Sequence, residues 1–232
     1  MKRNEKYFRE HMEEMINLMR TQAPEHHFEF HEPFWVLITT ILSHRTKDEV
    51  TDRAARALEE KYHDMDGLSK ASYEDVLKII DKVGFKKAKA ERVINAAKII
   101  RERFGGEVPQ TIEDLTEIPG VGRKTANVVL SDGFGIPAIA VDTHVQRICM
   151  RTGISHSHNP EDTEMILRRI VPEKLWLGLN PMMVEFGKTI CKPVGPRCES
   201  CKINSFCDYY DSEKGKKGEE RKGNKNDVKK KK

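Results

Sequence analysis

Lys124 and Asp142 occupy positions where an amine and a carboxylate can do chemistry. Lys124 follows the glycine-punctuated segment IPGVGR, and Asp142 follows the apolar run AIAV. A cation in the first turn of a helix is opposed by the helix dipole, by about 0.3–1 kcal/mol at exposed sites. The same field favours the neutral amine, which is the nucleophile needed to form a Schiff base. We therefore interpret Lys124 as a candidate nucleophile.

Each of these two residues also has a simpler explanation. Lys124 can be a solvated lysine that touches a phosphate, and Asp142 can be an ordinary helix N-cap. As a pair they do more, because a carboxylate beside an amine can accept its proton and stabilise a developing positive charge on a sugar. That interpretation requires the two side chains to meet in space, which the sequence does not show.

The segment before Lys124 predicts a site for a DNA phosphate. Two glycines tolerate a tight turn and the close approach of a foreign backbone, and the first amides of the following helix form an anion site. Gly120, Val121, Gly122 and Arg123 are the candidate DNA contacts of this helix-hairpin-helix. The alternative is a plain helix–helix connection with glycine caps.

Four cysteines gather near the end of the chain. Cys191, Cys198, Cys201 and Cys207 follow the spacing C-x6-C-x2-C-x5-C. Four thiolates can hold a [4Fe–4S] cluster, whereas structural zinc more often uses two separated C-x2-C pairs. The spacing favours iron–sulfur over zinc, with disulfides far behind in a reducing compartment. The fifth, Cys149, lies in an apolar helical context that predicts a buried thiol.

Helical patterns must position these residues, because apolar residues recur at helical spacing and no alternating strand is evident. The sequence predicts an all-α fold, without internal repeats. We expect one helix to begin at Pro33, one to span 86–103, one to open at the capping pair Thr111 and Asp114, and one to run from Asp142 to Gly153.

Bulk composition excludes some protein classes. Residues 212–232 hold ten Lys and Arg against four Asp and Glu, a local balance of +6, so the other 211 residues carry about −2. The net charge of +4 therefore describes a basic tail, which we expect to be disordered. No apolar stretch is long enough for a membrane span, and the charged N-terminus excludes a secretory signal. We expect a cytoplasmic, nucleoid-associated protein.

Together, these blocks give the chain a resemblance to the endonuclease III family of DNA glycosylases. The motifs IPGVGRKTANVVL and IAVDTHVQRICMRT and the cysteine spacing carry it, over about residues 10–210. It implies two helical domains with a DNA cleft between them. One is a six-helix barrel with the helix-hairpin-helix, over 24–137, and the other is an iron–sulfur cluster domain made of 1–23 and 138–211.

The resemblance also implies an activity. Family members are bifunctional enzymes that excise damaged pyrimidines and then nick the strand 3′ to the lesion by β-elimination. Lys124 matches the nucleophile, Asp142 matches the catalytic carboxylate, and the four cysteines match the cluster ligands. The expected partner is double-stranded DNA with damaged bases or abasic sites, bound by a monomer.

Several positions depart from the family pattern. Arg45 stands where bacterial members carry a glutamine that fills the gap left by the flipped base, and Phe85 stands where they carry a leucine wedge. The DNA-contacting lysine of the first cysteine loop is replaced by Gly195, so Lys192 or Arg197 can substitute. His144 can touch a phosphate or be a helix-surface histidine, and Phe85 can stack into DNA or pack in the core.

Two other functions stay open from the sequence. One is a mismatch glycosylase that acts on thymine or uracil opposite guanine with the same fold and cluster. The other is a noncatalytic DNA-binding scaffold, in which the hairpin grips phosphate and the cluster staples a domain. A zinc-stapled version of either would be colourless.

Overall fold

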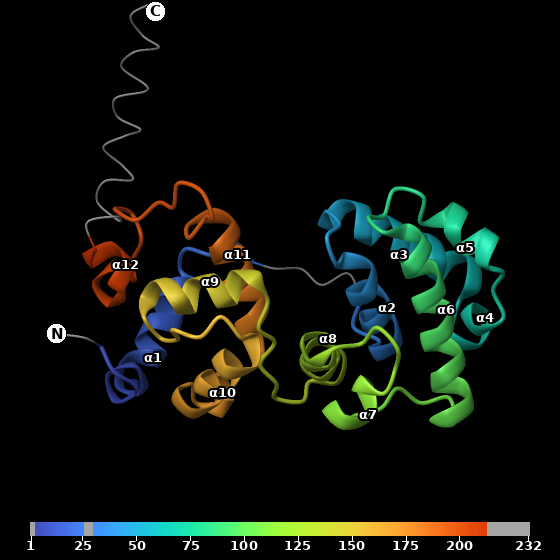
Figure 1. Ribbon diagram of the computed structural model, residues 1–232, viewed down its shortest axis with the longest axis horizontal. Coiled ribbons are helices and arrows are strands. Elements are labelled where there is room, and N and C mark those ends of the chain that lie inside the picture. Colours follow the sequence, from blue (N-terminus) through green and yellow to red (C-terminus); the bar gives the residue numbers. More distant parts are fainter. Residues whose placement is uncertain (1–2, 26–29, 213–232) are drawn as a thin grey trace, which may run out of the picture. The chain divides into compact units, whose positions relative to one another are not determined.

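The computed structural model describes residues 3–25 and 30–212, and within them helices are the only regular secondary structure (Figure 1). The prediction of an all-α fold is therefore confirmed. The basic tail predicted to be disordered lies, beyond Ser212, outside the described residues. None of the described helices is long and apolar enough to cross a bilayer.

The helices follow the chain in short, closely connected segments. The α-helices are α1 (Glu5–Arg20), α2 (Pro33–Ser43), α3 (Asp48–Tyr62), α4 (Met65–Ser69), α5 (Tyr73–Ile79), α6 (Lys86–Arg103), α7 (Ile112–Thr116), α8 (Arg123–Val128), α9 (Thr143–Thr152), α10 (Pro160–Ile170), α11 (Leu179–Thr189) and α12 (Asp208–Asp211). A π-helical segment, η1 (Val129–Gly133), continues α8, and the 3₁₀ turns are η2 (Glu173–Leu175) and η3 (Asn204–Phe206).

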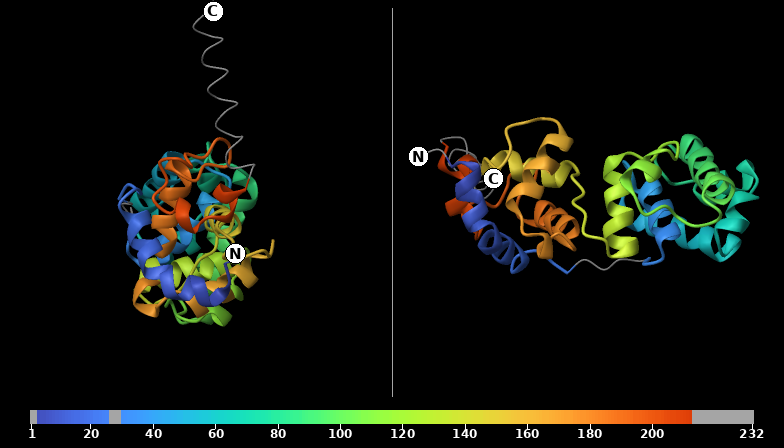
Figure 2. Two further views of the ribbon diagram at one scale, coloured as in Figure 1. Left: turned by 90° about the vertical axis from the view of Figure 1, so that its left-hand side faces the viewer. Right: turned by 90° about the horizontal axis from the view of Figure 1, so that it is seen from below.

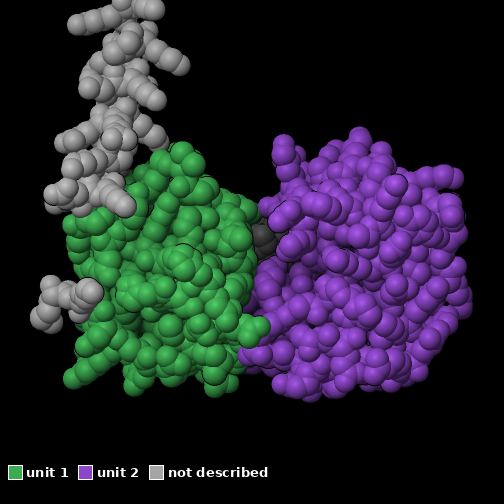
Figure 3. All heavy atoms as spheres, viewed as in Figure 1, with its two compact units in different colours: residues 1–27, 141–232 green, residues 28–140 purple. Residues whose placement is uncertain are grey.

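The chain divides into two compact units, coloured separately in Figure 3. Residues 28–140 form one unit, which holds α2 to α8 and η1. Residues 1–27 and 141–232 form the other, so the N-terminal helix joins the C-terminal half of the chain.

Helix α2 is the centre of the 28–140 unit. Seven of its eleven residues are buried, and the helix contacts α3, α6, α8 and η1. A helix that is apolar nearly all round is stable only when neighbours cover every face. Pro33 begins the helix as predicted, since its missing N–H is not needed there, and the Glu32 side chain caps the Trp35 amide at 3.1 Å. The buried residues of α2 therefore form a large part of the core of this unit.

In the other unit, α1 packs against α10 and α11 (Figure 2). Arg3 links the segment before α1 to α12, since its guanidinium contacts Asp208 at 2.5 Å and Asp211 at 2.8 Å. The Gln22 side chain pairs with the backbone of the cysteine loop, donating to the Ser200 carbonyl and accepting from the Lys202 amide, each at 2.7 Å. The N-terminal helix thus supports the segment that carries the four cysteines.

Candidate active site and cysteine pocket

Lys124 is the second residue of α8, directly after the glycine turn that links α7 to α8. The predicted capping pair is confirmed at the start of α7, where Thr111 Oγ1 accepts the Asp114 amide at 3.1 Å. Gly122 is the N-cap of α8 and provides no side-chain cap. The half-buried Lys124 therefore stands at the positive end of a helix, as expected from the sequence.

The two glycines of this turn have different structural roles. Gly120 has φ +87°, and a Cβ there would come within 2.8 Å of the Arg92 side chain, so a larger residue would be strained. Gly122 has an ordinary φ, and no atom lies within 4 Å of its missing Cβ. Nothing within the described unit explains Gly122, whose open side is available to a molecule from outside.

The other two hairpin candidates, Val121 and Arg123, differ in how far their side chains are buried. Val121 is buried in the core of the unit, and its amide donates to the Ile118 carbonyl at 3.0 Å. Its side chain therefore anchors the turn and is not available for a DNA contact. Arg123 is half-buried at the first position of α8.

The pKa of His44, the residue that follows α2, depends on the charge of Lys124. Burial lowers the pKa of His44, and the positive charges of Lys124, Lys89, Arg45 and Arg92 lower it further. Among these cations Lys124 has the largest effect, so the α2 C-terminus and the start of α8 share one electrostatic environment. Burial and the neighbouring cations therefore both favour the neutral form of the His44 imidazole.

We predict that replacing Lys124 with methionine raises the pKa of His44 towards 6.5. Removal of a neighbouring ammonium favours the imidazolium, so the sign of the change is upward. Titration of the His44 ring resonances by NMR measures it, with the exposed Lys98→Met on α6 as the control that leaves the pKa unchanged. An unchanged pKa in Lys124→Met would mean that Lys124 is already a neutral amine in the free protein.

Asp142 caps α9, in the other unit. Its Oδ1 accepts the amides of His144 at 2.8 Å and Val145 at 2.9 Å, and the predicted helix from Asp142 to Gly153 is confirmed. The carboxylate is half-buried and rigidly oriented by these two bonds. Lys124 and Asp142 thus belong to different units, with Asp142 two residues beyond the boundary at residue 140.

His144 is held by its neighbours in α9 and α11. Its Nδ1 lies 3.2 Å from an Arg147 guanidinium nitrogen, which also donates to the Gly187 carbonyl at 2.8 Å. Arginine has no acceptor, so Nδ1 accepts and the neutral ring carries its hydrogen on Nε2. His144 is therefore a fixed N–H donor, which is compatible with the predicted phosphate contact.

Arg45 and Phe85, forty residues apart in sequence, lie together in the 28–140 unit. The Arg45 guanidinium stands 5.6 Å from the centre of the Phe85 ring. Both have left-handed backbones, with φ 54° and 59°, which costs about 1–2 kcal/mol for a residue other than glycine. Phe85 is 65% exposed, so the alternative of core packing is wrong.

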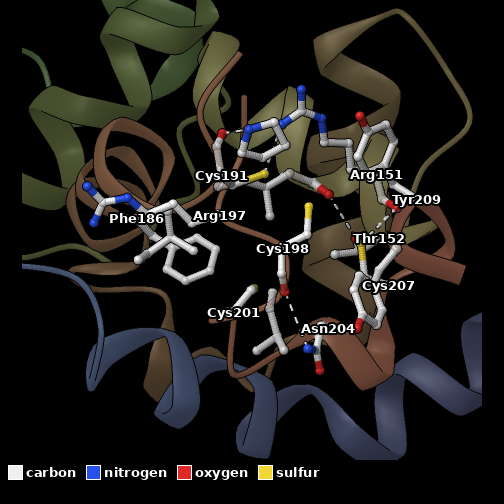
Figure 4. A pocket seen from close by; sticks show the side chains of 15 residues that line it. Arg151, Thr152, Phe186, Cys191, Arg197, Cys198, Cys201, Asn204, Cys207 and Tyr209 are labelled. Carbon is white, nitrogen blue, oxygen red and sulfur yellow. Dashed lines mark hydrogen bonds between the residues drawn. The ribbon is translucent and has the colours of Figure 1, made fainter. Parts of the chain in front are cut away.

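The four cysteines line one pocket of the second unit (Figure 4). Cys191, Cys198, Cys201 and Cys207 are all free thiols, and apolar side chains such as Phe186 and Ile203 complete the walls. Burial raises the pKa of Cys201 to about 12 and also raises that of Cys207. A bound cation would reverse this, since a thiol that coordinates a metal is deprotonated.

The four thiols line the same pocket without forming a ligand group for one metal ion. Among residues 3–25 and 30–212, no three His, Cys, Asp or Glu side chains converge as ligands of a single metal ion. The fifth cysteine, Cys149, is fully buried as predicted, and burial raises its pKa to about 12.

Two arginines of α9, for which no motif in the sequence predicted a role, hold the cysteine loop. Arg151 donates to the carbonyls of Lys192 at 2.7 Å and Pro193 at 3.0 Å, and to Cys191 Sγ at 3.4 Å. Arg147 donates to the Cys191 carbonyl at 2.9 Å. Their spacing of four residues on one helix face is the signal that could have revealed them.

The family comparison matches residues 38–173 to the HhH-GPD superfamily base excision DNA repair proteins. Endonuclease III from Thermotoga maritima is 46% identical over 199 residues, which cover 86% of this chain and 93% of the relative. Endonuclease III from Escherichia coli K12 is 36% identical over 198 residues, covering 84% and 94%.

This chain is also similar in structure to solved DNA glycosylases. A trapped endonuclease III–DNA covalent intermediate matches with a TM-score of 0.81 and 31% identity, covering 92% of this chain and 98% of the other. A thermostable thymine-DNA glycosylase matches with a TM-score of 0.79 and 25% identity, covering 88% and 97%.

Proposed function

The chain belongs to the endonuclease III family within the HhH-GPD superfamily of base excision DNA repair proteins, and from this membership we propose its reaction. The protein is a DNA glycosylase that also acts as an AP lyase. Its substrate is double-stranded DNA that contains an oxidised or otherwise damaged pyrimidine or an abasic site, and it acts as a monomer. The observation that carries this proposal is Lys124 in the first turn of α8, directly after the glycine hairpin.

The reaction begins with the damaged nucleotide outside the helix. A stacked base is out of reach of a protein nucleophile, so the nucleotide is flipped, at a cost of a few kcal/mol that is least for damaged pairs. The Lys124 amine attacks C1′ while the bond from C1′ to the base breaks and the base leaves with its electron pair. Asp142 accepts the proton that the amine loses and stabilises the positive charge on the sugar.

The strand is then cut by elimination. Opening of the sugar ring gives a Schiff base between Lys124 and C1′, which acidifies the hydrogen on C2′. Loss of that proton and cleavage of the bond from C3′ to its oxygen release the 3′ strand with its 5′-phosphate. Water hydrolyses the remaining Schiff base and frees Lys124. A solved endonuclease III–DNA complex with 31% identity is a trapped covalent intermediate, which supports this route.

DNA phosphates are expected at the hairpin and around Asp142. Gly122 leaves its outer side open, and the helical segment that follows runs from Arg123 through η1 to Gly133. The amides at the start of a helix attract anions. The Nε2–H of His144 adds a donor in the other unit. These contacts position the duplex without reading its sequence.

The cysteine pocket would hold a [4Fe–4S] cluster. A cluster of eight atoms needs thiols that surround a space, whereas a single zinc ion needs four that meet at one point. The four free cysteines that line one apolar pocket provide the donor set of such a cluster. When bound, the cluster supplies no step of the excision and holds the loop that Arg147 and Arg151 also grip.

We predict that Asp142→Asn lowers the excision rate by about 10²–10⁴-fold. Asparagine caps a helix as well as aspartate does, so the bonds to His144 and Val145 survive while the proton acceptor is lost. Single-turnover excision rates and thermal unfolding are measured together. An Asp142→Asn variant that loses activity only in proportion to its stability would reduce Asp142 to a structural cap.

A second candidate is a mismatch thymine-DNA glycosylase, favoured by the match to a solved thymine-DNA glycosylase at 25% identity. Two duplexes separate the candidates, one with a thymine glycol opposite adenine and one with thymine opposite guanine. Faster excision of the thymine glycol supports the first proposal, and faster excision of the mismatched thymine supports the second.

A further inference from the structure

Lys89 is a lysine inside the 28–140 unit that the proposed chemistry does not use. It lies on the first turns of α6, four residues before the buried Val93, and is only 2% exposed. Lysine is almost never fully buried unless its ammonium is paired. The hydrogen-bond partners of its ammonium therefore explain how Lys89 can be buried.

The Lys89 ammonium has three acceptors at the end of α2. Its Nζ donates to the carbonyls of Leu42 at 2.7 Å and His44 at 2.5 Å, and to Thr46 Oγ1 at 2.9 Å. Burial and the nearby Arg92 lower the pKa of Lys89 to about 8, so the side chain is charged at neutral pH. Three N–H donors meet three oxygens, which satisfies the group completely.

Thr46 connects the Lys89 ammonium to a second loop, the one before α6. Its Oγ1 also accepts the Gly84 amide at 3.2 Å, so one hydroxyl joins the segment after α2 to the segment before α6. The two backbones are in close contact, because a Cβ on Gly84 would lie 2.6 Å from the Arg45 carbonyl oxygen. Only glycine permits this approach.

Two exposed residues with left-handed backbones lie next to these contacts. Arg45 lies between His44 and Thr46, and Phe85 directly follows Gly84. Their left-handed backbones turn the two side chains out of the fold, where the guanidinium lies over the ring. A conformation that is costly for each residue persists only where surrounding contacts impose it.

We propose that Lys89 is a positioning residue that, through Thr46, holds Arg45 and Phe85 as one preformed element for insertion into a duplex at a damaged base pair. This inference rests on the proposed DNA glycosylase function and deepens it. A preformed element gives up little conformational freedom when DNA binds. The space that a flipped nucleotide leaves can then be filled without first ordering two separate loops.

The test uses substrates that do and do not require insertion. A duplex with one thymine glycol requires an element that fills the vacated stack, whereas a single strand with one abasic site has no stack to fill. We expect Lys89→Met to slow excision from the duplex by about 10- to 100-fold and to leave cleavage of the single strand unchanged. Lys98→Met, at an exposed site on the same helix, should change neither rate.

A fluorescent duplex reports the insertion directly. With 2-aminopurine opposite a tetrahydrofuran abasic analogue, wild-type binding should raise the emission as the element unstacks the strand, and Lys89→Met should lose most of that rise. In a double-mutant cycle, Phe85→Ala should add little to Lys89→Met, since both act on the same step. Full additivity would contradict a shared element.

Two further variants cover the case in which Lys89→Met does not fold. Thr46→Val removes only the shared hydroxyl, and Gly84→Ala forces the two backbones apart without removing a charge. Both should reproduce the duplex-specific loss. If every folded variant changes the duplex rate and the single-strand rate by the same factor relative to wild type, the role of Lys89 is overturned. If the wild-type protein shows neither excision nor trapping, the proposed function is overturned instead.

Discussion

Replacing Lys124 with alanine should abolish the covalent adduct that borohydride forms between the protein and a duplex containing one thymine glycol. Borohydride reduces a Schiff base to a stable amine, so the adduct reports the bond between the Lys124 nitrogen and C1′. Removal of an enzyme's nucleophile costs at least roughly 10⁴-fold in rate. Base release and strand cleavage by Lys124→Ala should both fall by this amount. Gel separation of the trapped complex and single-turnover rates measure the two effects.

The matched control is Lys98→Ala, which removes an exposed lysine from α6 and should trap as well as wild type. Adduct formation by Lys124→Ala would assign the Schiff base to another amine. Base release by wild type with no adduct would mean a monofunctional glycosylase. The mismatch thymine-DNA glycosylase would then become the favoured function. Unimpaired excision by Lys124→Ala would overturn the mechanism.

Replacing Cys198 with serine should remove the iron–sulfur cluster and unfold the segment that it holds. Structural metal sites contribute on the order of 10 kcal/mol of apparent binding free energy in small zinc domains, and a buried cluster with four ligands is expected to have a comparable effect. Cys198 is the most buried of the four cysteines that we propose as ligands. The variant should lose the yellow-brown colour, its iron and sulfide, and the thermal stability of the unit that contains α1 and α9 to α12.

Cys149→Ala is the matched control, because it removes a thiol that is fully buried in the same unit and outside the ligand set. It should cost stability through a small cavity and keep the colour and the iron. A colourless wild-type protein with one bound zinc would replace the cluster with a zinc site. Loss of colour in Cys149→Ala alone, with Cys198→Ser unaffected, would contradict the assignment of the ligands.

Local signals predicted the four helices that the sequence analysis described, but not the other α-helices of the described residues. Pro33, the pair Thr111 and Asp114, and the segment from Asp142 to Gly153 all mark helix ends that the structure confirms. Each depends on bonds between residues a few positions apart, which the sequence displays directly. The all-α fold follows from the same local periodicity.

The sequence by itself thus determined which residue types are present for chemistry, and the ends of several helices, including the one that Asp142 begins. Tertiary structure decided which of them share a site. It buried Lys89, exposed Phe85 and brought Arg45 onto its ring across forty residues. It also placed four thiols around one pocket and gave α9 the arginines that grip their loop. The physical reason is that burial and long-range pairing depend on how distant helices pack, and no local pattern specifies which side of a helix end will face another loop.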